Sequence, residues 1–229
     1  MNSGLPLLHA VTPIDAPDRA GIDAGAAAIA RGPEVALHAR APGAPGRILA
    51  ELADRLRRAT EGTGARLFVN DRADVAEIVE ADGVHLPATG LPTAMVRTLV
   101  GPEVWIGRSV HHPEEAMEAV EEGADYVFLG PIWETASHPG RRALGPDAIA
   151  RALPARVVAI GGVTPERVSQ CLDAGAYGVA AISALWGAKD PGSVVAAMLL
   201  LLKSGRQDER DANHRKRRHA GDRNRGIPG

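Results

Sequence analysis

The chain has 229 residues, of which 45% are hydrophobic, and this length and composition suit a domain with a sizeable core. A single cysteine, Cys171, excludes an intramolecular disulfide framework and favours a reducing compartment. The net charge is only −2, no apolar run approaches the roughly 20 residues of a membrane span, and the first residues lack a basic leader. We therefore expect a cytoplasmic protein that does not contact a membrane.

Eight short apolar runs predict eight β-strands, with room for a helix after each of them. The runs are Leu7–Val11, Val35–Ala39, Arg66–Asn70, Gly83–Leu86, Val104–Val110, Tyr126–Gly130, Arg156–Ile160 and Gly178–Ser183. Amphipathic stretches between them predict helices. The clearest are Gly46–Ala59, Ala73–Glu80, Pro113–Glu122, Pro165–Ala174 and Pro191–Lys203. Three of these begin with proline, which the first turn of a helix tolerates well.

Alternating strands and helices are typical of parallel βαβ units, and eight units predict a single α/β domain, a (βα)8 TIM barrel over residues 1–203. A doubly wound sheet is the alternative fold. That fold usually carries a glycine fingerprint after its first strand, where this chain reads His9-Ala10-Val11-Thr12-Pro13. The sequence therefore favours the barrel.

Residues 204–229 differ from the rest because they contain almost no apolar side chains, and this composition predicts a disordered, basic tail. From Lys203 onward there are nine Lys/Arg and four Asp/Glu, a balance of +5 that leaves −7 for the preceding residues. The basic run Arg215–Arg218 could contact nucleic acid or an acidic surface. A solvated tail explains the same composition, and we expect no nucleic-acid partner.

The ends of the last two predicted strands carry a phosphate-binding pattern. One strand stops at Gly161-Gly162 and the other at Ile182-Ser183, and a helical pattern follows each stop. Glycine lets backbone N–H groups approach an anion closely, and a helix N-terminus adds a positive dipole. In a (βα)8 barrel, the loops after strands seven and eight are the usual phosphate site. These four residues are therefore predicted to bind the phosphate of a small molecule.

Other polar side chains fall at the predicted carboxyl ends of the strands, where barrel enzymes carry their functional residues. They are His38, Arg40, Asn70, Asp71, His85, Ser109, His111, Thr135, Ser137 and His138. Plainer explanations stay open for these residues. His38 and His85 lie within predicted strands and could pack in the core. The Asn, Asp, Thr and Ser residues could belong to turns. Histidines on separate strands could bind zinc, but no HxH pair or acidic cluster accompanies them, so we expect no protein-bound metal centre of this kind.

Five segments resemble the thiamine phosphate synthase/TenI family, and the resemblance runs from about Leu7 to Leu201. They are LFVNDRADVAEIVEADGVHL, IGRSVHHPEEA, GADYVFLGPIWET, VVAIGGVTPERV and GAYGVAAISAL. The resemblance implies a (βα)8 barrel that acts on a phosphorylated thiazole in thiamine biosynthesis. The synthases of the family use magnesium to join a pyrimidine diphosphate to thiazole phosphate and release pyrophosphate. The TenI-like branch is a thiazole tautomerase, which aromatises an exocyclic thiazole carboxylate phosphate without a required metal.

The chain departs from the synthase pattern where that pattern carries charge. Ala36-Leu37-His38-Ala39-Arg40 stands in place of Gln-x-Arg-x-Lys, Gly90 replaces a magnesium-binding acid, and His138 replaces a lysine, whereas Asn70-Asp71 match. A diphosphate leaving group needs cations to stabilise its developing charge, while a proton shift needs an acid, a base and an anchor for the substrate. We therefore expect a tautomerase without a cofactor, closest to the TenI-like branch. A synthase that uses Mg²⁺ is the alternative.

The resemblance also implies roles for individual residues. The GRSVH segment resembles the family segment with the proton-shuttling histidine, so His111 is the expected general acid/base, with His38 as a second proton-transfer candidate. Arg40 would bind the substrate carboxylate and Ser109 would orient the substrate. The remaining expected substrate contacts are Asn70, Thr135 and Ser137. A non-catalytic protein that binds thiazole phosphate is a third alternative, supported only by the basic tail, and a homo-oligomer stays open.

Overall fold

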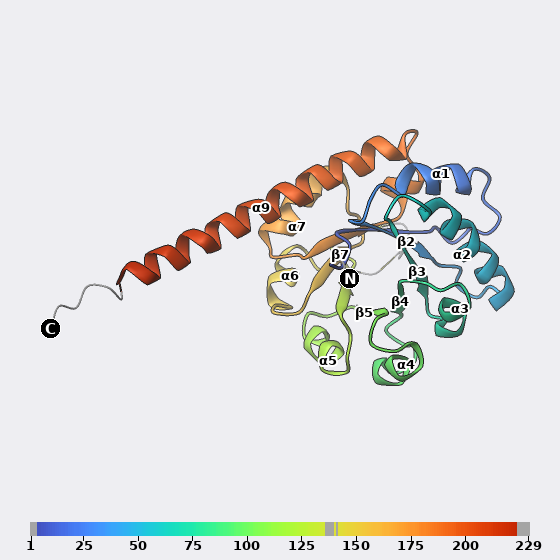
Figure 1. The fold of residues 1–229 in the computed structure, drawn as a ribbon, viewed down its shortest axis with the longest axis horizontal. Helices are drawn as coiled ribbons and strands as arrows, with labels where there is room; N and C mark the ends of the chain where they lie inside the picture. The colour runs from blue at the N-terminus through green and yellow to red at the C-terminus, as the bar shows by residue number, and fades with distance from the viewer. Residues whose placement is uncertain (1–3, 136–139, 141, 224–229) are drawn as a thin grey trace.

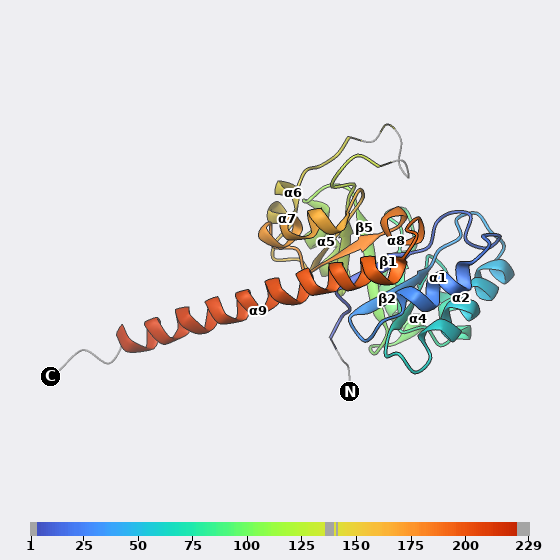
Figure 2. The ribbon, with the colours of Figure 1, turned by 90° about the horizontal axis from the view of Figure 1, so that it is seen from above.

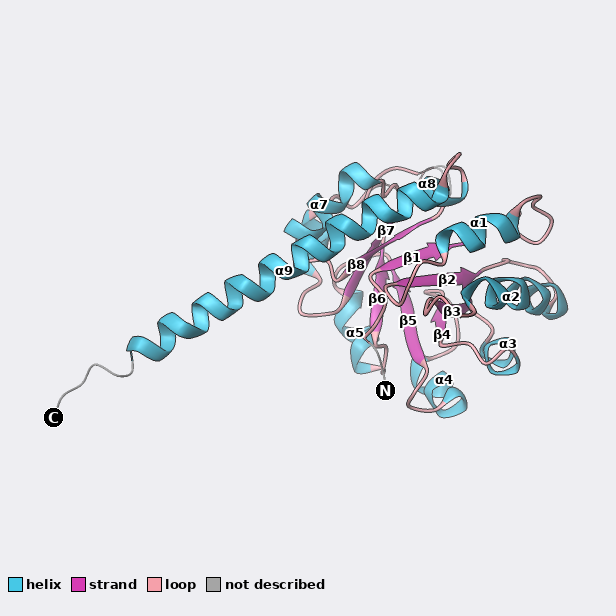
Figure 3. Ribbon diagram, turned by 45° about the horizontal axis from the view of Figure 1, so that its top comes forward, coloured by secondary structure: helices cyan, strands magenta, loops and turns pink. Residues whose placement is uncertain are grey.

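The computed structural model describes residues 4–135, 140 and 142–223, with side chains described as far as Gln207. Its centre is a closed barrel of eight parallel strands, each hydrogen-bonded to the next and the last to the first (Figures 1 and 3). The strands are β1 (Leu8–Val11), β2 (Val35–Ala39), β3 (Arg66–Asn70), β4 (Gly83–Leu86), β5 (Trp105–Val110), β6 (Tyr126–Leu129), β7 (Val157–Ile160) and β8 (Gly178–Ala181). The predicted (βα)8 fold is therefore confirmed, and the doubly wound alternative is wrong.

Helices surround the barrel and connect successive strands (Figure 1). They are α1 (Ile22–Ile29), α2 (Gly46–Thr60), α3 (Ala73–Ile78), α4 (Thr93–Val100), α5 (Glu115–Glu121), α6 (Asp147–Arg151), the 3₁₀ turn η1 (Pro165–Arg167), α7 (Val168–Asp173), α8 (Ser183–Trp186) and α9 (Pro191–Arg223). All five predicted helical stretches contain a helix. Of the described helices, none is both long enough and apolar enough to cross a membrane.

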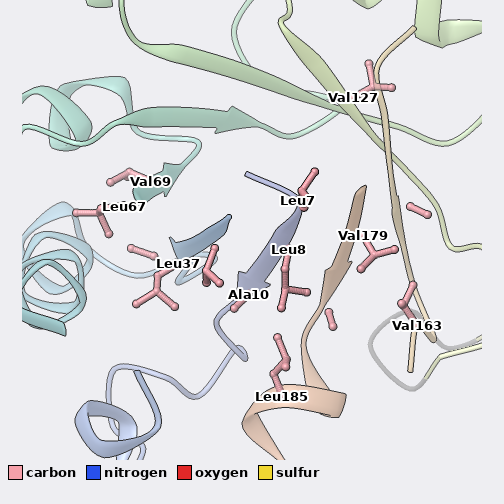
Figure 4. Close-up of a cluster of buried hydrophobic side chains, with 14 of the residues drawn as sticks. Leu7, Leu8, Ala10, Leu37, Leu67, Val69, Val127, Val163, Val179 and Leu185 are labelled. Carbon is pink, nitrogen blue, oxygen red and sulfur yellow. The ribbon is translucent and has the colours of Figure 1, made fainter. Parts of the chain in front are cut away.

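Apolar side chains on the outer face of the strands pack against the helices and form the main core. Figure 4 shows part of this layer, with Leu8 and Ala10 of β1 next to Val179 of β8 and Leu185 of α8. Successive strand residues face opposite sides of a sheet, so the alternate residues fill the barrel interior. The buried Cys171 lies in the outer core on α7, and burial raises the pKa of its thiol to about 12.

The barrel interior is filled by aromatic rings and imidazoles. Phe68, Tyr126 and Phe128 lie there with three histidines, and the ring centroids are 3.9–6.1 Å apart. Two glycines make room for them, since a Cβ at Gly83 would lie 2.2 Å from Phe68 and one at Gly107 would lie 2.2 Å from Tyr126. The interior is therefore a packed and partly polar core rather than a channel.

Helix α9 begins at Pro191, as predicted, and Asp190 caps it by accepting the backbone N–H of Ser193 over 3.1 Å. Its first part packs against α1, α7 and α8, and the rest projects away from the barrel in both views (Figures 1 and 2). The sequence predicts disorder from residue 204, whereas the helix continues to Arg223. No proline occurs between positions 191 and 228 to stop it. Residues 224–229 lie outside the described residues.

Candidate active site

A cavity of about 500 Å³ lies at the carboxyl ends of the strands. Most of the predicted site residues line it: Arg40, Asn70, Ser109, His111, Thr135, Gly161, Gly162, Ile182 and Ser183. Ser137 and His138 lie outside the described residues, and His38 is missing from the lining. Because the lining comes from the ends of all eight strands and the loops after them, the fold gathers residues that are far apart in the sequence.

Gly161 and Gly162 turn the chain sharply after β7. Their φ angles of 92° and 67° lie in the left-handed region that favours glycine. A Cβ at Gly161 would lie 2.6 Å from Pro131, and one at Gly162 would lie 2.8 Å from the Cβ of Trp133. Arg167 fixes this loop, since its guanidinium donates to the Gly162 carbonyl over 2.6 Å and stacks over Trp133. Glycine is therefore required at both positions by conformation and by space.

The same loop presents backbone donors to the cavity. Within the described residues, the N–H groups of Gly161, Gly162 and Ser183 have no hydrogen-bond acceptor. All three residues line the cavity, and Ser183 is the first residue of α8. Unpaired backbone N–H groups beside a cavity can bind an oxyanion.

His111 lies beyond the end of β5, and one of its ring nitrogens is fixed. Its Nδ1 lies 2.9 Å from the backbone carbonyl oxygen of Gly130, which can only accept, so Nδ1 carries the proton. The backbone N–H of His111 donates to the Glu115 carboxylate over 2.7 Å. Nε2 contacts no hydrogen-bond partner among the described residues, and in the neutral ring it holds a lone pair. His111 therefore offers a free base to the cavity it lines.

Ser109 is held by a buried pair of side chains behind it. Its Oγ lies 2.8 Å from His85 Nε2, and His85 Nδ1 lies 3.2 Å from the Tyr126 hydroxyl. Burial, then the neighbouring imidazoles and Arg40 and Arg108, lower the pKa of His85 well below its ordinary value, so the ring is neutral. Burial raises the pKa of Tyr126 well above its ordinary value. His85 thus packs in the core, as one interpretation allowed, yet it also lines the cavity and orients Ser109.

Arg40 brings a positive charge to the cavity wall. Burial lowers the pKa of its guanidinium below the ordinary value, and no described residue pairs with this group. Its backbone is clamped by Thr12, whose Oγ donates to the Arg40 carbonyl and accepts the Arg40 N–H, both over 2.9 Å. The sequence did not single out Thr12. A fixed backbone and an unpaired guanidinium suit the binding of a ligand carboxylate or phosphate.

His38 lies below the cavity, inside the barrel, where it has no exposed surface. Its Nε2 lies 2.9 Å from His9 Nδ1, its Nδ1 lies 3.0 Å from Asn70, and its ring stacks on Phe68. Burial lowers the pKa of His38 to about 4. A second proton-transfer group would need a ring nitrogen free toward the ligand. Both ring nitrogens of His38 are paired in the core, so this geometry does not favour the expected catalytic role, which stays a prediction.

The described lining of the cavity differs from a two-acid magnesium site in its acidic side chains. Asp71 is the acid that lines the described part of the cavity, and no group of three or more His, Cys, Asp or Glu in that part could hold a metal ion. At Gly90 a Cβ would lie 2.9 Å from the Pro87 ring and 3.1 Å from the Pro87 carbonyl oxygen. Pro87 therefore occupies the space that a second acid would need.

Comparisons with known proteins agree with the barrel fold and show the family to which the chain is similar. A family model described as thiamine monophosphate synthase (TMP-TENI) matches residues 8–185. The chain is 40% identical over 192 residues to the thiamine-phosphate synthase of Anaeromyxobacter dehalogenans, and the match covers 82% of each protein. It is 45% identical over 153 residues to the bifunctional thiamine biosynthesis protein ThiM/ThiE of Symbiobacterium thermophilum. That match covers 65% of this chain and 32% of the relative, so the chain spans about a third of its length.

A solved structure supports the same relationship. The thiamine phosphate pyrophosphorylase from Pyrococcus furiosus superposes on this chain with a TM-score of 0.74 and 30% sequence identity. The superposition covers 87% of this chain and 96% of that one. The names of these relatives describe the synthase reaction rather than the tautomerase reaction.

Proposed function

The chain belongs to the thiamine monophosphate synthase family, whose members are enzymes of thiamine biosynthesis, and within it we propose that the chain is a thiazole tautomerase. The substrate would be the exocyclic thiazole carboxylate phosphate. The observation that carries this proposal is the free Nε2 of His111, held at the cavity by the bond from Nδ1 to Gly130. General acid–base catalysis by one positioned side chain contributes about 10²–10⁴-fold to a rate.

The reaction needs no second substrate. Nε2 of His111 takes the proton from the acidic ring carbon, and the imidazolium returns a proton to the exocyclic carbon while the double bonds move into the ring. No atom and no electron is gained or lost. An imidazole can take a proton on a ring nitrogen and give it back, so one ring can perform both transfers.

The two charged ends of the substrate have separate partners in the cavity. The N–H groups of Gly161, Gly162 and Ser183 bind the phosphate, and Arg40 binds the carboxylate by charge-assisted hydrogen bonds. Ser109, held by His85, orients the ring between them. Thr135 also lines this cavity.

A thiamine phosphate synthase is the second candidate, because the relatives carry that name and Asn70-Asp71 match the synthase pattern. Against it stand the single acid of the described lining and the crowding at Gly90. In this reading Asp71 and the substrate phosphates would hold Mg²⁺, which supplies charge stabilisation for a leaving diphosphate. The non-catalytic alternative rests on the tail, whose side chains beyond Gln207 lie outside the described residues.

One pair of assays separates the two reactions. The exocyclic thiazole carboxylate phosphate is supplied with EDTA present, and aromatisation is followed by absorbance. The pyrimidine diphosphate and thiazole phosphate are supplied with Mg²⁺, and pyrophosphate release is measured. We expect fast, EDTA-insensitive aromatisation and little pyrophosphate. Aromatisation no faster than in buffer would overturn the tautomerase, and stoichiometric pyrophosphate release would establish the synthase.

A further inference from the structure

Two buried histidines form a hydrogen-bonded line from the bottom of the barrel to the cavity wall. His9 Nε2 lies 3.1 Å from the Pro6 carbonyl oxygen, and His9 Nδ1 lies 2.9 Å from His38 Nε2. His38 Nδ1 lies 3.0 Å from the side-chain amide of Asn70. Neither histidine has any exposed surface. We call Pro6, His9 and His38 the buried relay.

The carbonyl of Pro6 sets the direction of every bond in the buried relay. A carbonyl oxygen only accepts, so His9 Nε2 carries a proton. A neutral imidazole has one N–H, so His9 Nδ1 accepts and His38 Nε2 is the donor. His38 Nδ1 is then an acceptor, and the group of Asn70 that faces it must donate. That group is the amide nitrogen, Nδ2.

The opposite direction is costly. If the Asn70 oxygen faced His38, Nδ1 of His38 would need the proton and Nε2 would become an acceptor for His9. His9 would then either carry two protons or turn a lone pair toward the Pro6 carbonyl. Burial lowers the pKa of His9 well below its ordinary value and that of His38 to about 4, so neither ring is charged near neutral pH. A lone pair buried against an oxygen is an unsatisfied contact.

The oxygen and nitrogen of the Asn70 side-chain amide can exchange places without moving any other heavy atom. The structure has Asn70 Oδ1 at 3.0 Å from His38 Nδ1. Amide oxygen and nitrogen have nearly the same shape, so a half-turn of the amide places Nδ2 at this position instead. The two orientations of the Asn70 amide have equal shape. The positions of the protons in the buried relay therefore decide which orientation is adopted.

We propose that the buried relay fixes the amide of Asn70 so that Nδ2 faces His38 and Oδ1 faces the cavity. His9 and His38 are then positioning residues, and Asn70 is a specificity-determining acceptor for an N–H or O–H of the ligand. The other amide atom has no partner among the described residues, and Asn70 lines the cavity. An anionic oxygen would be repelled at this position, so the anionic ends of a ligand bind elsewhere in the cavity. This inference does not depend on which reaction takes place there.

The direct test is ¹⁵N NMR of the histidine rings in the full-length protein at neutral pH. We expect both His9 and His38 to show a protonated Nε2 and an unprotonated Nδ1. A protonated Nδ1 on His38, or two protons on either ring, would overturn the proposal. The readout needs no ligand and no activity, so a failed tautomerase assay leaves it unaffected.

Substitutions test whether the relay sets the direction. In Asn70→Asp the carboxylate cannot donate, so His38 should change to a protonated Nδ1. In His9→Phe the anchor is lost, and both tautomers of His38 should be populated. Phe68→Leu is the matched control, because Phe68 stacks on His38 with centroids 4.9 Å apart but makes no hydrogen bond to it, and it should leave the tautomer unchanged.

Thermal unfolding of each variant verifies that it is folded. If His9→Phe does not fold, Asn70→Asp still tests the direction of the hydrogen bonds. This variant should fold, because Asn70 lies at the cavity wall and aspartate has nearly the same size. A His38 ring whose Nδ1 stays unprotonated in Asn70→Asp would overturn the proposal, as would an unchanged ring in a folded His9→Phe.

Discussion

His111 and Gly130 are joined by a hydrogen bond from the imidazole Nδ1–H to the backbone carbonyl oxygen over 2.9 Å. This bond fixes both the tautomer and the orientation of the ring. It leaves Nε2 as the basic atom, which is the requirement for a group that takes a proton from a bound ligand. The catalytic proposal therefore rests on the contact between His111 and Gly130, which can be tested by replacing His111.

Replacing this imidazole should remove most of the catalysis. We expect His111→Gln to lower kcat for aromatisation by about 10²–10⁴-fold, because an amide cannot take and return a proton at neutral pH. Absorbance of the aromatic product gives the rate. His112→Ala is the matched control, since the adjacent His112 is exposed and does not line the cavity, and it should keep the wild-type rate. An unchanged rate in His111→Gln would show that another group is the base.

Arg40 should contribute to substrate binding more than to the chemical step. A hydrogen bond between charged groups contributes about 1.5–3 kcal/mol, so we expect Arg40→Gln to raise KM by about 10–100-fold with a smaller change in kcat. Arg47→Gln serves as the control, because Arg47 lies exposed on α2 and pairs with Glu51. Steady-state kinetics separate the two constants. If Arg40→Gln lowers kcat alone, the carboxylate assignment fails.

The glycine loop after β7 allows a test with two similar glycines. We expect Gly162→Ala to weaken the binding of inorganic phosphate, because the new Cβ would lie 2.8 Å from Trp133 and 3.0 Å from the Glu134 carbonyl. Gly101 has a similar φ of 77° but nothing within 4 Å of its Cβ. Both variants should therefore lose about 1–3 kcal/mol of stability through backbone strain, measured by urea unfolding. Calorimetric phosphate binding should fall in Gly162→Ala and stay unchanged in Gly101→Ala.

The strands could be predicted closely because a parallel strand is buried on both faces and appears as a continuous apolar run. The predicted bounds of β2, β3 and β4 match the structure residue for residue. Four helices, α1, α4, α6 and α8, were expected only in general and were given no bounds from the sequence. Two of them have five residues or fewer, and α1 is rich in alanine, so their apolar periodicity is weak.

Site residues could be predicted only where their position at the carboxyl end of a strand identifies them. Arg40, Ser109 and His111 were found by that rule and line the cavity. The rule does not separate side chains that face the cavity from those one layer deeper, so it also selected His38. His9 was missed because its role depends on its hydrogen bond to His38. That bond depends on how β1 and β2 lie side by side in the barrel.

Stability should fall in mildly acidic solution. His9, His38 and His85 all have pKa values that burial lowers below the ordinary 6.5, to about 4 for His38. Above pH 6.5 they are neutral in both the folded and the unfolded chain. As the pH falls from 6.5 toward 4, the unfolded chain binds protons that the folded chain does not, so the free energy of unfolding decreases by about 1.4 kcal/mol per pH unit for each histidine.

Urea unfolding at pH 7.5, 6 and 5 measures this slope. The His85→Gln variant keeps an amide that can contact Ser109 and Tyr126, and it should reduce the slope by about one histidine. The exposed His112→Ala should leave the slope as in the wild type, because its ring is in water in both states. Equal slopes in His85→Gln and the wild type would contradict a neutral buried His85.

The space around Gly90 predicts how readily this barrel could acquire a two-acid magnesium site. The resemblance places a synthase acid at this position, but here a Cβ would lie 2.9 Å from the Pro87 ring. We expect Gly90→Asp alone to gain no Mg²⁺ affinity, since a proline ring cannot move aside as a flexible side chain can. Pro87→Gly combined with Gly90→Asp removes the ring and should bind Mg²⁺ more tightly than either single variant in calorimetric titration. Equal Mg²⁺ affinity in the single Gly90→Asp variant and the double variant would show that Pro87 is not the obstacle.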